Sequence, residues 1–93
     1  MDYWQVSKST FTSEYAVFRG LLRELRTRKG LTQVQLSETL GMPQSFVSKY
    51  ETGERRLDIV EIRLVCKSLG IALPAFVKKF EARLPESKKR GAA

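Results

Sequence analysis

Four polar residues gather in the middle of the chain, within residues 44–51. In a helix, successive residues stand about 100° apart, so this segment divides into two faces. The polar face, which contains no acid, consists of Gln44, Ser45, Ser48 and Lys49. The opposite, apolar face consists of Phe46, Val47 and Tyr50. Glutamine, serine and lysine can hydrogen-bond the purine edges in a major groove, which admits a helix. The pattern indicates a base-reading face, although a solvated helix surface has similar composition.

The sequence before this segment predicts another helix, which would position the segment. Thr32 and Gln35 form a capping box, which predicts a helix beginning at Thr32. Gly41 can take the left-handed conformation that ends such a helix. Pro43 then permits a second helix to begin, either as its cap or as its first residue. Residues 32–51 are therefore predicted to form two short helices joined by a tight turn.

This core resembles the helix-turn-helix of the Xre/Cro-like regulators, a family that includes many phage repressors. The resemblance covers about residues 15–71 and rests on Leu31-Thr32-Gln33-x-x-Leu36, Gly41, and Gln44-Ser45-x-Val47-Ser48-Lys49-x-Glu51-x-Gly53. It implies an all-α, five-helix bundle of the lambda-repressor-like type that binds double-stranded DNA, usually as a dimer. One departure is Pro43, because the family usually has a capping serine or threonine there.

The resemblance also implies roles for individual residues. Base edges would be faced by Gln44, Ser45 and Lys49, with Ser48 beside them. Gln33 would touch a phosphate. Arg26 and Glu51 would form a partly buried pair that ties the first helix to the recognition helix.

Two adjacent arginines, Arg55 and Arg56, follow the recognition segment in a predicted turn. A loop that leaves a groove-bound helix runs close to the phosphate backbone, so both arginines are predicted phosphate contacts. The alternative is an exposed basic loop without a function.

The remaining sequence predicts three more helices around this core. The first begins near Thr12 or Ser13 and runs to about Lys29, and its apolar residues recur at helical spacing. The next is capped by Asp58, with Glu61 reaching back, and contains Cys66 as a core residue. The last opens at Pro74 and ends near residue 84.

These helices define a domain over residues 13–84, between an extended arm at 1–12 and a disordered basic tail at 85–93. The aromatic residues of the arm, Tyr3, Trp4 and Phe11, either fold back on the domain or contribute to a dimer interface or DNA contact. Lys88, Lys89 and Arg90 in the tail would attract DNA weakly.

The apolar stripe of the last helix has two interpretations. The stripe follows a 3-4 spacing through Leu73, Phe76, Val77, Phe80 and Leu84, and the upstream helices can cover only part of it. The stripe predicts a self-complementary dimer contact, and docking onto the domain's own core is the alternative.

Composition excludes several function classes. The chain has 93 residues, a net charge of +7, no histidine and one cysteine. The charge favours an anionic partner. Without histidine or a second cysteine, zinc binding and most imidazole-based catalysis are excluded for one chain. We therefore expect no metal or cofactor and no enzymatic activity. With no apolar run of membrane-spanning length and no secretory signal, we expect a cytoplasmic protein.

The sequence thus predicts a homodimeric transcriptional regulator, a repressor, that binds specific double-stranded DNA through helix 43–51. The alternative is an antitoxin-type module that binds a protein partner and regulates its own operon. A basic chromatin protein would share the charge and fold but would discriminate little between sequences.

Overall fold

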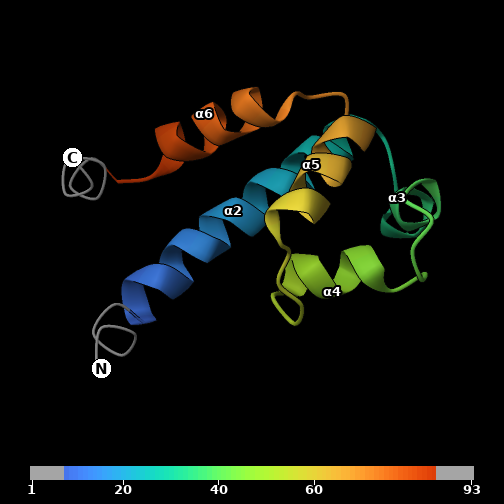
Figure 1. Ribbon diagram of the computed structural model, residues 1–93. Helices are drawn as coiled ribbons and strands as arrows, with labels where there is room; N and C mark the ends of the chain where they lie inside the picture. Colours follow the sequence, from blue (N-terminus) through green and yellow to red (C-terminus); the bar gives the residue numbers. More distant parts are fainter. Residues whose placement is uncertain (1–7, 86–93) are drawn as a thin grey trace.

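The computed structural model describes residues 8–85, with side chains from residue 13 onward. Its helices are α2 (Lys8–Arg28), α3 (Gln33–Thr39), α4 (Phe46–Thr52), α5 (Ile59–Ser68) and α6 (Leu73–Arg83). Within this part of the chain there are five helices and no strand, as predicted. The long helix α2 contacts both α4 and α6, which lie on opposite sides of it (Figure 1). This arrangement leaves α4 at one surface of the domain.

Helix α2 begins earlier than the sequence predicted. It starts at Lys8, so residues 8–12 of the predicted extended arm are helical. The serine and threonine residues in this stretch cost less than about 0.7 kcal/mol each in a helix. Phe11 also stands four residues before Tyr15 in the sequence, so the helical apolar spacing continues backward. Tyr3 and Trp4 of the arm, and the tail at 86–93, lie outside the described residues.

The capping predictions for α3 and α5 are confirmed. Thr32 accepts a hydrogen bond from the backbone N–H of Gln35, and the Gln35 side chain accepts one from the Thr32 backbone. Asp58 and Glu61 make the same reciprocal pair at the start of α5. Gly41 follows α3 at φ 69°, in the left-handed region that favours glycine. Local chemistry therefore fixes the starts of α3 and α5 and the point at which the chain leaves α3.

A single apolar core joins all five helices. Its buried members are Phe18, Leu21, Leu22, Leu36, Phe46, Val47, Tyr50, Leu57, Val65, Cys66, Leu69 and Phe76. Burying one large apolar side chain contributes about 1.5–3 kcal/mol. Cys66 is a core residue, as predicted, and burial raises the pKa of its thiol to about 11. The side of α4 that carries Phe46, Val47 and Tyr50 is therefore held in this core.

Helix α6 docks on the chain's own core, which corrects the prediction that Phe76 serves in a dimer. Phe76 is only 2% exposed, and its ring meets Phe18 edge-on at 5.8 Å between centroids. Phe80 contacts Phe18 in the same way at 6.3 Å and is half-buried, as is Leu84. Phe76 is buried within the chain because α2 supplies an aromatic partner, Phe18. The spacing of the apolar residues on α6 does not identify that partner. The alternative interpretation, intramolecular docking, applies to Phe76.

None of the helices in the described residues is long and apolar enough to cross a membrane.

Candidate nucleic-acid interface

The polar residues predicted to read bases form one exposed surface at the start of α4. Gln44, Ser45 and Lys49 are exposed, and Ser48 is half-buried. The helix itself begins at Phe46 and ends at Thr52, which corrects the predicted range of 43–51. Gln44 and Ser45 therefore lie in the turn that precedes the helix.

Backbone hydrogen bonds explain this later start. The backbone N–H of Phe46 donates to the Pro43 carbonyl at 2.9 Å, which closes a tight turn over residues 43–46. The backbone N–H of Lys49 donates to the Ser45 carbonyl at 3.0 Å, and this is a helical bond. Proline therefore opens the turn and not the helix.

Ser37 holds the first turn of α4 from the preceding helix. Its hydroxyl is fully buried and accepts a hydrogen bond from the backbone N–H of Val47 at 3.1 Å. That N–H is one of the donors that a helix start leaves without an intrahelical partner. Ser45, the N-cap residue, makes no capping hydrogen bond with its side chain. The hydroxyl of Ser37 on α3 thus supplies the acceptor that the side chain of the N-cap residue does not, and the sequence does not indicate it.

At the other end of α4, Glu51 is bound by residues from two helices. The expected Arg26–Glu51 pair forms, with Arg26 Nε 2.7 Å from Glu51 Oε2 and Nη2 3.1 Å from Oε1. Arg26 also donates through Nη1 to the Leu31 carbonyl at 2.7 Å. Gln33, predicted to contact a phosphate, donates through Nε2 to Glu51 Oε1 at 2.8 Å. Glu51 thereby joins α2, α3 and α4.

Arg19 supports the same end of α4, although the sequence indicated no role for it. Its Nη1 donates to the Glu51 carbonyl at 2.8 Å, one of the carbonyls left over at a helix C-terminus. Gly53 then ends the helix at φ 87°. A Cβ at Gly53 would lie 3.2 Å from Arg19 Nε, so the absence of a side chain there leaves room for the guanidinium.

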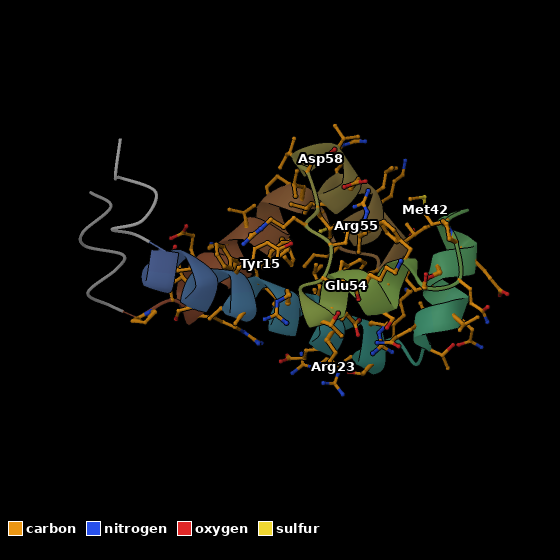
Figure 2. All side chains as sticks on the ribbon, turned by 90° about the horizontal axis from the view of Figure 1, so that it is seen from below. Tyr15, Arg23, Met42, Glu54, Arg55 and Asp58 are labelled. Atoms are coloured by element: carbon orange, nitrogen blue, oxygen red, sulfur yellow. The ribbon has the colours of Figure 1, made fainter. Side chains whose placement is uncertain are left out.

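The two arginines after α4 are engaged within the protein. Arg55 Nη1 and Nη2 donate to Glu61 Oε1 and Oε2 at 3.0 and 2.7 Å, and the guanidinium lies 5.0 Å from the centre of the Phe46 ring. This pairing lowers the pKa of the Glu61 carboxyl. The Arg56 guanidinium lies 4.2 Å from the centre of the Tyr15 ring. Figure 2, seen from the side of α4, shows Arg55 on the segment between α4 and α5.

Comparison with known proteins identifies the architecture. A family model described as helix-turn-helix matches residues 22–76. An XRE-family like protein from Pseudomonas syringae pv. tomato has a similar solved structure. Its TM-score is 0.79 and its sequence identity is 41%, and the match covers 86% of this chain and 98% of that one. The HTH-type transcriptional regulator PrpR of Mycobacterium tuberculosis is 32% identical over 63 residues, which are 68% of this chain and 13% of PrpR. The chain thus spans a small part of that relative.

Proposed function

The chain belongs to the Xre/Cro-like helix-turn-helix family, and on this premise we propose that it is a transcriptional regulator that binds specific double-stranded DNA. The observation that carries the proposal is the placement of Gln44, Ser45 and Lys49. All three are exposed on one surface, whereas the opposite face of α4 is buried and both ends of the helix are held by hydrogen bonds. A rigid, exposed polar helix start is what base reading in a major groove requires.

The residue types suggest which bases are read. Lysine donates to the O6 and N7 acceptors of guanine, so Lys49 favours guanine. Glutamine can pair with N6 and N7 of adenine, so Gln44 favours adenine. Ser45 and Ser48 can donate to or accept from either. Together these residues can read a few adjacent base pairs in one groove.

Phosphate contacts would hold these side chains in register with the base pairs. Arg56 is exposed in the turn after α4, and Gln33 lies at the first residue of α3. The primary amide of Gln33 has a second N–H besides the one bound to Glu51, so it can still donate to a phosphate. The net charge of +7 adds general attraction to DNA.

We propose further that the protein acts as a homodimer. Two copies would place their α4 helices in successive major grooves about 34 Å apart. Three large aliphatic residues are exposed on α5, namely Ile59 at 62%, Val60 at 64% and Leu64 at 49%. These residues are distinct from Gln44, Ser45 and Lys49, so a twofold contact through them would use other side chains than those proposed to read bases. A second copy of the chain therefore fits this surface.

The proposed mode of regulation is repression. Repression requires only that the protein occupy its operator, which the proposed DNA contacts would achieve. Occupying an operator needs no further contact.

The test is selection of bound sequences from random duplex DNA at near-physiological salt, followed by titration of the selected sequence against a scrambled control. The proposal predicts a palindromic motif with half-sites one helical turn apart, bound about a thousandfold more tightly than the control. Binding without an enriched motif, and with a steep loss of affinity as salt rises, would indicate a generic DNA-binding protein.

A further inference from the structure

Arg55 occupies a position between the start of α4 and the start of α5. Its guanidinium lies over the ring of Phe46, which is the first residue of α4. Its backbone N–H donates to the Lys49 carbonyl at 3.1 Å, so the turn folds back along the helix. The residues that immediately precede Phe46 are Gln44 and Ser45. Arg55 therefore contacts the end of α4 that carries the proposed base-reading side chains.

Three of the five N–H groups of this guanidinium donate to acceptors inside the protein. Nη1 donates both to Glu61 Oε1 and to the Arg56 carbonyl, each at 3.0 Å, and Nη2 donates to Glu61 Oε2 at 2.7 Å. A bidentate pair of this kind has a fixed geometry. A phosphate would have to displace the Glu61 carboxylate to gain the same two donors.

Glu61 is itself fixed by the start of α5. Its Oε1 accepts the backbone N–H of Asp58 at 3.0 Å, and its own N–H donates to Asp58 Oδ1 at 2.8 Å. The carboxylate that holds Arg55 is thus part of the helix cap. The chain of contacts runs from the α5 cap through Arg55 to the first ring of α4.

We infer that Arg55 is a positioning residue that fixes the base-reading end of α4, and that it is not the phosphate contact predicted from its place in the sequence. Glu61 acts with it as the anchor. This inference rests on the proposed function, since it concerns how that function becomes selective between sequences.

Two substitutions test the inference by separating charge from geometry. Arg55→Lys keeps the positive charge but loses the planar, two-pronged donor and the flat surface over Phe46. Glu61→Gln removes a negative charge, which by charge alone would strengthen DNA binding, while glutamine still serves in a capping box. Each variant should lower the ratio of specific to scrambled affinity by roughly tenfold, about the effect of one lost base contact.

The salt dependence of DNA binding distinguishes a positioning residue from a phosphate contact. For both variants the slope of log K against log salt should stay at the wild-type value. Arg56→Gln changes the neighbouring arginine and serves as the matched variant. Its slope should become shallower by about 0.9. Suppose that Arg55→Lys keeps the wild-type ratio of specific to scrambled affinity while Arg55→Gln makes the slope shallower by about 0.9. Arg55 is then a phosphate contact and the inference is wrong.

A measurement without DNA keeps the inference independent of the proposed function. In the free protein, Arg55→Lys and Glu61→Gln should both shift the aromatic NMR signals of Phe46 and speed amide exchange at Phe46 and Val47, whereas Arg56→Gln should leave them in place. Unchanged Phe46 signals in both variants would overturn the inference. A wild-type protein that selects no motif would instead contradict the proposed function.

Discussion

The guanidinium of Arg26 and the carboxylate of Glu51 join α2 to α4 through two hydrogen bonds, of 2.7 Å from Nε and 3.1 Å from Nη2. Only 9% of the Arg26 side chain and 4% of the Glu51 side chain are exposed. A pair with so little access to water cannot lose one partner without leaving the other charge buried.

Arg26→Met should therefore lower the free energy of unfolding by about 3–5 kcal/mol, which urea denaturation would measure. The double variant Arg26→Met/Glu51→Leu should recover most of that loss, because no charge is then left unpaired. Arg28→Gln, which removes the exposed pair with Glu24, is the control and should change stability little. A loss from Arg26→Met no larger than that of the control would contradict this account of the pair.

The sequence predicts correctly those features that depend on residues close together in the chain. The capping boxes at Thr32 and Asp58 involve residues three apart, so the sequence spacing already contains their geometry. The Arg26–Glu51 pair spans 25 residues and was expected only through the family resemblance. Contacts without such a guide were missed, as for Ser37 and Val47, because spacing does not specify which distant groups meet.

The wrong prediction for Phe76 and the contacts of Arg55 and Arg56 that the sequence does not predict have related causes. The stripe on α6 correctly indicated an apolar face but not its partner, and α2 provides that partner through Phe18. Arg55 and Arg56 are predicted phosphate contacts because of their charge, their position after the recognition segment and the family resemblance. Their contacts with Glu61 and Tyr15 come from other helices, and nothing in the local sequence identifies them.

Ser37→Ala should destabilise the protein by about 1–3 kcal/mol, because the backbone N–H of Val47 would be left buried without an acceptor. Ser45→Ala is the matched control in thermal or urea unfolding. Ser45 is exposed and makes no capping hydrogen bond, so its loss should stay within about 0.5 kcal/mol. If the two variants were equally destabilised, Ser37 would not be supporting the start of α4.

Alkaline stability should depend on Cys66. Burial raises the pKa of its thiol to about 11, whereas in an unfolded chain a thiol has a pKa of about 8.5. The unfolded state therefore loses the proton first, and the contribution of the thiol is complete below about pH 8.5 and is lost as pH rises toward 11. Cys66→Ala should show a smaller decrease in unfolding free energy between about pH 8.5 and 10.5 than wild type. Parallel decreases in both proteins would contradict this assignment.

The dimer proposal predicts that Val60→Glu yields a monomer in sedimentation velocity at concentrations where the wild type is dimeric. The substitution places a charge on an exposed apolar surface, so it should disturb association and leave the fold intact. Val77→Glu, on the exposed side of α6, is the matched control and should remain dimeric. If only Val77→Glu dissociates, the interface lies on α6, as the sequence first suggested.

Lys49→Ala should lower affinity for the selected DNA by roughly 1–3 kcal/mol and relax the preference at one base pair, because Lys49 is proposed to read guanine. Arg56→Ala should weaken binding to all sequences alike and reduce the salt slope by about 1, since a phosphate contact carries no sequence information. Titration of both variants on selected and scrambled duplexes over a salt series distinguishes the two roles. Equal losses for Lys49→Ala on the two duplexes would remove Lys49 from the base-reading set and leave it as a general contact to the DNA backbone.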